Sequence, residues 1–285
     1  MKSNYYPIGL FLVILLVNFI SWIVTLLKRS LKNFLSTKTI TYIKYIPISI
    51  ARVKNWYPFL LNYIGLKNED IERIYQLRNG TKFHIHYSLD AATIFVIYIR
   101  RDYGKMADNS IIVDIGANIG VYSVYSSLQG KNNLVYAYEP MKETFDHLAE
   151  NIRINDCQDK IIPFNYGIAS KKEKRKMYLV DSVNNTIIEK NPDLSSIEIE
   201  TITLEDVFID NNLEIIDLLK LDCEGAEYEI FYNLPEQYFP KIKEIRMEFH
   251  GLEKGKELRD FLKTKGFKIN KFKKGNLWAT YKPSG

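Results

Sequence analysis

The chain has 285 residues, of which 46% are hydrophobic and 26% are charged, the balance of an ordinary globular protein. The formal net charge of +5 is mildly basic, so it suits a membrane surface or nucleic acid only where it is concentrated. The two cysteines, Cys157 and Cys223, are too few for a disulfide framework or a zinc site. We therefore expect a reducing compartment.

The N-terminal segment is predicted to be a membrane anchor. Ile8 to Leu27 is uncharged, and a helix of about 20 residues spans roughly 30 Å, the thickness of a bilayer's hydrocarbon core. A signal peptide and a buried or interfacial helix are the alternatives, but the run ends in Lys28-Arg29 without a small-residue cleavage site. Basic residues are denser after the segment than before it, which predicts that the rest of the chain is cytoplasmic.

We expect four parts along the chain. These are an anchor at residues 1–30, a basic and aromatic juxtamembrane segment at 31–66, a hairpin and helix at 67–108, and a catalytic domain at 109–285. The juxtamembrane segment either lies on the lipid headgroups or is a plain linker. In the third part, alternation around Asn79-Gly80 predicts a hairpin from Ile74 to Tyr87. A helix from Ala91 to Arg101 is predicted to follow it.

Short apolar runs alternate with helical patterns through the last part. The predicted strands are 111–115, 134–138, 161–164, 215–221 and 242–249, and the predicted helices are 120–129, 143–155, 204–209, 226–232 and 258–265. This alternation predicts a doubly wound α/β fold with a mostly parallel sheet. The runs 267–272 and 277–281 indicate a hairpin, so the sheet should finish with an antiparallel strand. Residues 176–203 are predicted to be a charged insertion flanked by extended runs, and Lys171–Lys176 a solvated turn.

A glycine-containing turn follows the first of these strands, in the sequence Asp114-Ile-Gly-Ala-Asn-Ile-Gly120. In open parallel sheets, ligands bind at the carboxyl ends of the strands. Gly116 lets the backbone turn sharply beside a ligand, and Gly120 lets the next helix pack closely. Glu139 ends the second strand, where a carboxylate can accept both hydroxyls of a ribose. We expect a nucleoside-like cofactor, with a turn that only serves packing as the alternative.

Two residues of this turn indicate the kind of cofactor. Asn118 stands where a dinucleotide site has its second glycine, so its side chain suits a cofactor without phosphates. Acidic Asp114 suits a cationic ligand such as S-adenosylmethionine (SAM) better than a pyrophosphate, because like charges repel. A dinucleotide-dependent oxidoreductase is the less favoured alternative.

From about Asp102 to the C-terminus, the sequence resembles the FkbM-type SAM-dependent methyltransferases. The motifs that carry the resemblance lie, in order, at residues 113–122, 136–140, 148–155, 203–206, 219–227 and 248–250. The most specific are Asp-x-Gly-Ala-Asn-x-Gly from Asp114 and Lys-x-Asp-x-Glu-Gly-Ala-Glu from Lys220. The resemblance implies a seven-stranded class I methyltransferase (Rossmann-like) sheet with a reversed last strand. It also implies O-methylation of glycans, polyketides or similar small molecules.

The resemblance further implies a cofactor site around the glycine-containing turn. The SAM methionine would lie on Gly116, Ala117 and Asn118, and Glu139 would hold the ribose. Adenine would lie beside Pro140 and the residues after the third strand. The full candidate set is Asp114, Gly116, Ala117, Asn118, Gly120, Glu139, Pro140, Asn165 and Gly167.

A hydroxyl is a poor nucleophile at neutral pH, so its methylation is helped by a base within hydrogen-bond reach. Asp222, Glu224 and His250 are the candidates by position, and Glu248 is expected to face the same cleft. Of Asp222 and Glu224, one could hold the cationic cofactor while the other accepts the proton of the substrate. Glu227 enters a predicted helix, where a carboxylate more simply complements the helix dipole. Lys220 is expected to be buried or to form an ion pair.

No metal site is assigned. His84 and His86 share one face of the predicted hairpin, but the sequence offers no third ligand nearby. A divalent metal at Asp222 and Glu224 is a less favoured alternative. Lys171–Lys176 lacks interleaved aromatic residues, so no nucleic-acid site is expected.

Together these patterns predict a membrane-anchored O-methyltransferase acting on a glycan, a lipid-linked sugar or a similar small molecule. The alternative is a non-catalytic protein that binds SAM or a nucleoside within a membrane assembly.

Overall fold

The computed structural model describes residues 37–63, 73–87, 90–178, 195–273 and 275–282. The predicted anchor at Ile8–Leu27 lies outside these residues. Among the residues that are described, no helix combines the length and apolar character needed to cross a bilayer. The chain divides into two compact units, Met1–Ile50 and Ala51–Gly285. Every contact described below lies within the second unit.

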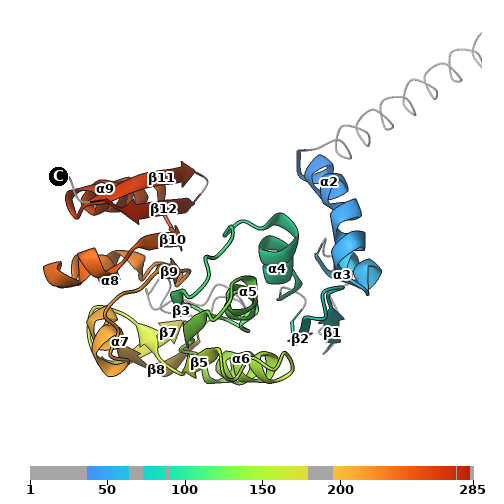
Figure 1. The fold of residues 1–285 in the computed structure, drawn as a ribbon, viewed down its shortest axis with the longest axis horizontal. Coiled ribbons are helices and arrows are strands. Elements are labelled where there is room, and N and C mark those ends of the chain that lie inside the picture. The colour runs from blue at the N-terminus through green and yellow to red at the C-terminus, as the bar shows by residue number, and fades with distance from the viewer. Residues whose placement is uncertain (1–36, 64–72, 88–89, 179–194, 274, 283–285) are drawn as a thin grey trace, which may run out of the picture. The chain divides into compact units, whose positions relative to one another are not determined.

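A seven-stranded sheet forms the centre of the second unit, in the order β11-β12-β10-β9-β3-β4-β5 (Figure 1). The five strands from β10 to β5 are parallel, and β12 is antiparallel to both β10 and β11. The expected α/β sheet with an antiparallel strand near its end is therefore confirmed. The bounds are β3 (Ile111–Ile115), β4 (Leu134–Tyr138), β5 (Ile161–Phe164), β9 (Leu218–Leu221), β10 (Glu244–Glu248), β11 (Phe267–Lys273) and β12 (Asn276–Tyr281).

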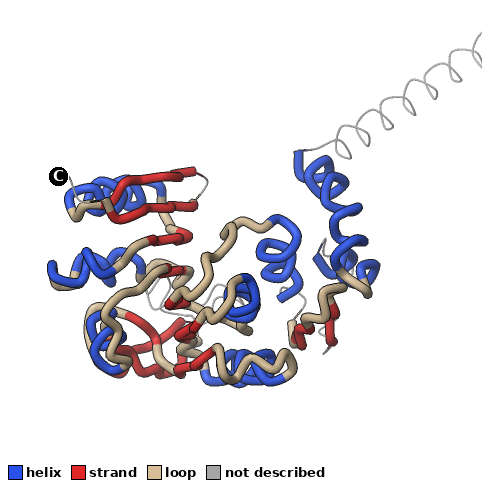
Figure 2. Tube along the Cα trace, viewed as in Figure 1, coloured by secondary structure: helices blue, strands red, loops and turns tan. Residues whose placement is uncertain are grey.

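Helices cover both faces of this sheet (Figure 2). Val113 and Ile115 of β3 point into the core made with α7 (Leu204–Asp210), α8 (Glu227–Tyr232) and α9 (Leu252–Thr264). The alternate residue Asp114 points to the opposite face, where it contacts Ser123 of α5 (Val121–Gln129). Helix α6 (Lys142–Arg153) packs beside α5. Because side chains alternate between the two faces of a strand, this period of two determines which of them can reach a ligand.

The N-terminal elements of this unit also follow the prediction. Strands β1 (Arg73–Gln76) and β2 (Lys82–Ile85) pair antiparallel around Asn79-Gly80, which confirms the hairpin. The predicted helix from Ala91 to Arg101 is present as α4 (Asp90–Ile94), which continues as the π-helix η1 (Phe95–Arg100). Before the hairpin, two helices occupy most of the predicted juxtamembrane segment, α2 (Thr37–Arg52) and α3 (Trp56–Tyr63).

A second, three-stranded sheet was not predicted. It has the order β6-β8-β7, with β6 (Gly167–Ile168), β7 (Glu173–Tyr178) and β8 (Ser196–Ile202). The expectation of a solvated turn at Lys171–Lys176 is wrong from Glu173 onward. An edge strand exposes one face and tolerates charged residues there, so its composition resembles that of a turn. Lys174, for example, pairs with Glu198 across the two strands at 3.2 Å. The middle of the predicted insertion, residues 179–194, lies outside the described residues.

Some boundaries differ from the prediction. Helix α9 begins at Leu252, six residues before the predicted start. The prediction began it too late because Gly255 interrupts the apolar pattern of the first turns. That glycine packs on a ring: a Cβ there would lie 2.3 Å from Cδ2 of Phe249. Strand β9 is shorter than predicted, and Ile216 forms only an isolated bridge with Ile242. A short 3-10 helix, η2 (Glu236–Lys241), leads into β10.

Candidate active site

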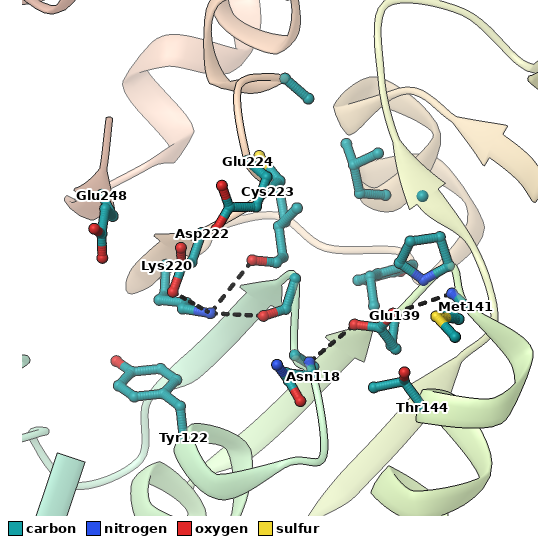
Figure 3. Close-up of a pocket in the computed structure, with 18 of the residues that line it drawn as sticks. Asn118, Tyr122, Glu139, Met141, Thr144, Lys220, Asp222, Cys223, Glu224 and Glu248 are labelled. Atoms are coloured by element: carbon teal, nitrogen blue, oxygen red, sulfur yellow. Dashed lines mark hydrogen bonds and ion pairs between the residues drawn. The ribbon is translucent and has the colours of Figure 1, made fainter. Parts of the chain in front are cut away.

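A cavity of about 350 Å³ opens at the carboxyl ends of β3, β4, β9 and β10 (Figure 3). One wall comes from α4 and η1, through Ala92, Thr93, Val96 and Ile97. Among the described residues, its charged lining consists of Glu139, Asp222, Glu224 and Glu248, together with Lys220. Figure 3 shows Glu139 on one side of Asn118 and the other three carboxyl groups on the opposite side.

The loop after β3 is fixed by two glycines. Gly116 has φ +72°, and a Cβ on it would lie 2.0 Å from the backbone oxygen of Asp222. Both Gly116 and Ala117 donate their N–H groups to the Tyr138 carbonyl at 3.0 Å. Gly120 has φ +83°, and its Cβ would lie 2.5 Å from Cδ1 of Leu148. The loop therefore runs against both β4 and β9 at a distance that leaves no room for a side chain at residue 116.

Glu139 is held by backbone donors. Its Oε2 accepts the N–H of Asn118 at 2.9 Å, and its Oε1 accepts the N–H of Met141 at 3.0 Å. Asn118 has the left-handed φ of 50° that this contact requires. Burial raises the pKa of Glu139 to about 7, although both backbone donors favour its charged form. Each carboxylate oxygen keeps a lone pair for a further donor, as recognition of a ribose would require.

The remaining residues expected at the cofactor end fall into two groups. Pro140 and Gly167 line the cavity, as do Gly116, Ala117 and Asn118. Asn165 does not. Its amide donates to the carbonyls of Glu139 and Pro140 at 2.9 and 3.0 Å. It therefore fixes the backbone behind the cavity rather than a ligand.

Asp114 lies beneath the loop and is not among the residues that line the cavity. Its Oδ1 is 3.0 Å from Nζ of Lys220, and its Oδ2 accepts from the Ser123 hydroxyl at 2.6 Å. Lys220 also donates to the Gly116 carbonyl at 2.8 Å. Burial lowers the pKa of Lys220, but Asp114 and Asp222 outweigh that effect, so the net shift is upward. The expected contact of Asp114 with a cationic ligand is replaced by a buried ion pair that supports the loop.

Asp222 contributes a carboxyl group at the end of β9. Its Oδ2 accepts from the Tyr103 hydroxyl at 3.3 Å and lies 4.0 Å from Nζ of Lys220. Burial raises its pKa, and Lys220 partly opposes the shift. Tyr103 is buried and lines the cavity, but sequence reasoning missed it because it belongs to no motif.

Arg246 of β10 fixes the segment that carries Tyr103. Its guanidinium donates to the carbonyls of Tyr103 and Lys105 and pairs with Glu244, the latter at 2.7 Å. The Trp278 ring of β12 covers the guanidinium, with its centroid 5.0 Å away. The position of Tyr103 thus depends on β10 and β12, two strands that lie more than 100 residues after it in sequence.

His250 is the cation of a partly buried charge cluster. Its Nε2 lies 3.1 Å from Oε2 of Glu224, and its Nδ1 lies 3.5 Å from Oε1 of Glu227. The Glu227 carboxylate raises the pKa of His250 to about 9. His250 is therefore protonated at neutral pH, and it is not among the residues that line the cavity. A protonated imidazole does not accept a further proton, so this arrangement disagrees with the expected role of His250 as a base and instead places its Nε2 against Glu224.

Glu227 has a larger part than a helix-dipole contact. It is fully buried and accepts the N–H groups of Cys223 and Gly225 at 3.3 and 3.2 Å. It thereby shapes the turn in which Glu224 adopts its φ of 52°.

Two further carboxyl groups, those of Glu224 and Glu248, lie at the same end of the cavity as Asp222. We call this end, opposite Glu139, the reaction end. Burial raises the pKa of Glu224 to about 7. Burial and the nearby Asp222 raise that of Glu248, which ends β10. Glu248 lines the cavity as expected, and the structure adds Tyr103 to this end. In their charged forms these carboxyl groups can bind a cation, and they repel a phosphate.

A metal-ligating geometry is found elsewhere in the described residues. The group of His, Cys, Asp and Glu side chains that converges on one point there is His84, His86 and Glu150, outside the cavity. The three carboxyl groups at the reaction end do not form such a group.

Comparisons with known proteins agree on a family. Residues 114–269, more than half of the chain, match the model described as the methyltransferase FkbM domain. Methyltransferase sdnD of Sordaria araneosa is 26% identical over 204 residues, covering 60% of this chain and 78% of the relative. The 31-O-demethyl-FK506 methyltransferase FkbM of Streptomyces tacrolimicus is 22% identical, covering 52% and 68%. The hexuronic acid methyltransferase AglP of Haloferax volcanii is 26% identical over 123 residues, covering 43% and 49%.

Proposed function

The chain belongs to the methyltransferase FkbM family, and on that premise we propose that it is a SAM-dependent O-methyltransferase. One observation carries the proposal: the cavity is acidic at both ends. Its lysine, Lys220, is directed to Asp114 and to the Gly116 carbonyl. A cationic cofactor suits this lining, whereas the pyrophosphate of a dinucleotide would meet like charges.

The residues at the Glu139 end fit SAM. Glu139 would accept the ribose hydroxyls with the lone pairs that Asn118 and Met141 leave available. The Gly116–Asn118 loop and Asp222 would hold the methionine part, where the carboxylate of Asp222 offsets positive charge. When bound, SAM supplies a methyl group on a cationic sulfur.

At the other end, we assign the proton acceptor to Glu224. Its pKa of about 7 matches a base that works near neutral pH. His250 holds its Oε2, so the carboxyl group is oriented before an acceptor hydroxyl arrives. Asp222 is left to the cofactor, and Tyr103 donates to Asp222 to fix its direction. A hydroxyl as acceptor agrees with the name of the Streptomyces relative, and a sugar acid as acceptor agrees with the name of the Haloferax relative.

For the acceptor and the location, we propose a lipid-linked sugar or surface glycan intermediate, reached from the cytoplasmic side. Support comes from the sequence: the uncharged stretch Ile8–Leu27 and the basic residues after it. Deleting residues 1–30 should then lower activity on acceptors in membranes without lowering the affinity for SAM. If the full-length chain and the chain without residues 1–30 were equally active, the N-terminal segment would have no role in substrate access.

The test uses the purified full-length chain in detergent. Calorimetry should show one SAM bound per chain, and labelled SAM should methylate material in membrane and glycan extracts. Asp222→Ala should abolish incorporation. Glu257→Gln, an exposed carboxylate of α9, is the matched control and should retain it. A folded protein without SAM binding contradicts the cofactor. Binding without methylation of any acceptor would support a non-catalytic SAM-binding protein instead.

A further inference from the structure

Three of the four histidines in the chain gather at one place outside the cavity. His84 of β2 and His86, which follows the end of that strand, have ring centroids 4.5 Å apart. The ring of His147, on α6, stacks on that of His86 at 3.4 Å and 4°. Glu150 follows one helical turn later on the same face of α6. The fold therefore supplies the third ligand that the sequence did not reveal.

The ligand atoms of this group are spaced for a metal ion. Nδ1 of His84 lies 2.9 Å from Oε1 of Glu150, and Nε2 of His86 lies 3.6 Å from Oε2. All three groups offer an atom within 4.8 Å of the others. Two ligands that are each about 2.1 Å from a tetrahedral zinc lie roughly 3.4 Å apart, so these distances bracket the required value. In addition, Nε2 of His86 is buried with no hydrogen-bond partner.

The backbone beneath these side chains is already fixed. The Asn151 side chain accepts the N–H of His84 at 2.7 Å and donates to its carbonyl at 3.0 Å. Asn155, two residues beyond the end of α6, makes the same pair of bonds with Lys82, at 2.8 and 2.6 Å. Two asparagines thus pair with β2 as a neighbouring strand would. A metal here would bind a prepared site, with little further ordering of the chain.

Hydrogen bonds also connect the elements that carry this site to elements that line the cavity. The amide of Asn151 donates to the Ile119 carbonyl at 2.9 Å, within the loop between Gly116 and Gly120. After β2, the N–H groups of His86 and Tyr87 both bond to Asp90, which opens α4. Helix α4 and η1 then form a wall of the cavity. A clamp between β2 and α6 would therefore hold both that wall and the glycine loop.

We propose that His84, His86 and Glu150 bind a divalent transition metal, with zinc the best match, and that the metal clamps the β1–β2 hairpin to α6. Two imidazoles and a carboxylate are a donor set that zinc accepts, with a water or another group as fourth ligand. The three side chains are half-buried, so an ion can reach them. None of them lines the cavity, which makes the metal a structural element and not a part of methyl transfer.

The test uses zinc chloride and the full-length chain, purified with a tag that contains no histidine. We expect one zinc per chain, a rise in melting temperature on adding zinc, and slower hydrogen exchange in residues 73–87. Cobalt(II) should give the visible absorption of a tetrahedral site. His84→Gln and Glu150→Gln should each weaken zinc binding by roughly 10- to 100-fold, and the double variant His84→Gln/His86→Gln should abolish the melting shift.

His147→Phe is the matched control, because it keeps a ring against His86 but removes both nitrogens. We expect this variant to bind zinc, since Glu150 supplies the third ligand. The double variant should fold, because Asn151 bonds to the backbone of residue 84 and not to its side chain. Equal zinc affinity in wild type and double variant, or no binding to wild type, would overturn the proposal. The group would then be an ordinary ion pair of Glu150 with two histidines. SAM affinity without zinc is measured separately, so the two proposals fail independently.

Discussion

The two ends of the cavity are built from different parts of the chain. At the Glu139 end, the carboxylate is held by the N–H groups of Asn118 and Met141, and those residues belong to two adjacent strand-to-helix turns. At the opposite end, Asp222 and Glu224 are held by the side chains of Tyr103 and His250. These partners come from a loop before β3 and from the end of β10.

Because of this difference, the residues that hold Glu139 should tolerate substitution of their side chains, whereas those that hold Asp222 and Glu224 should not. Backbone donors persist whatever side chain their residue carries, so the Glu139 end depends on loop geometry. The reaction end depends on the chemical identity of each partner. Substitution of Glu224, the proposed base, should therefore alter rate and pH dependence, and substitution of Glu139 should alter affinity for the cofactor.

The largest expected effect is on Glu224. Glu224→Gln removes the proposed proton acceptor but keeps the size of the side chain, so the methylation rate at saturating SAM should fall by about 10²–10⁴-fold. SAM affinity, measured by calorimetry, should change less than threefold in the same variant, roughly within the error of comparing two proteins. If Glu224→Gln also weakened SAM binding to a similar degree, Glu224 would contribute to cofactor binding, which would contradict the separation of the two ends.

The second prediction concerns the ion pair that joins the two ends. Lys220→Met leaves Asp114 buried without its cation and removes a donor to the Gly116 carbonyl. The free energy of unfolding, from urea denaturation, should fall by about 3–5 kcal/mol. Asp114→Asn/Lys220→Met should recover part of that loss, because no buried charge is then unpaired. A double variant as unstable as the single one would contradict the role of the pair.

The third prediction tests the Glu139 end alone. Glu139→Gln keeps one acceptor oxygen and replaces the other with an amide that cannot accept from a backbone N–H. SAM affinity should weaken by about 10- to 100-fold, and the rate at saturating SAM should stay close to that of wild type. Asp146→Asn, an exposed carboxylate of α6, should leave affinity unchanged.

The fourth prediction follows from the pKa of Glu139. Its value of about 7 lies above that of an ordinary glutamate because of burial, so the group is mostly protonated below pH 7. The charged form is the one that accepts ribose hydroxyls, so SAM affinity should rise about tenfold between pH 6 and pH 8 and then level off. Calorimetry in buffers of different ionisation enthalpy should also detect proton release. Glu139→Gln should flatten this dependence, whereas Glu224→Gln should flatten the pH dependence of the rate.

The smallest effect is expected at Tyr103. Tyr103→Phe removes one 3.3 Å hydrogen bond to Asp222 and leaves the ring in place. The methylation rate should fall by about threefold to tenfold, the value of one hydrogen bond. A loss as large as that of Glu224→Gln would indicate that Tyr103 contacts the reacting groups itself.

The same difference between the ends explains what could be predicted from the sequence. The strand-turn-helix order and the roles of Gly116 and Glu139 depend on residues close together in the chain, and local patterns reveal them. Asp114 was placed against the ligand because its position is next to the turn. The alternation of β3 instead directs it to the face that α5 covers, where it pairs with Lys220.

Long-range contacts account for what was missed. Tyr103 reaches Asp222 because Arg246, far away in sequence, holds its backbone. His250 was considered a base because strand position alone does not show that Glu224 and Glu227 lie on either side of it. Glu150 completes a group with His84 and His86 only after α6 packs on β2. In each case the partners are too far apart in the chain for spacing to connect them.

The place of β12 has a consequence for synthesis of the protein on the ribosome. It is inserted between β10 and β11, yet it follows both of them in the chain. Until residues 276–281 have left the exit tunnel, β10 has an unpaired edge on that side, and an unpaired strand edge is a template for aggregation. The nascent chain thus needs β12 before the sheet is continuous from β11 to β5.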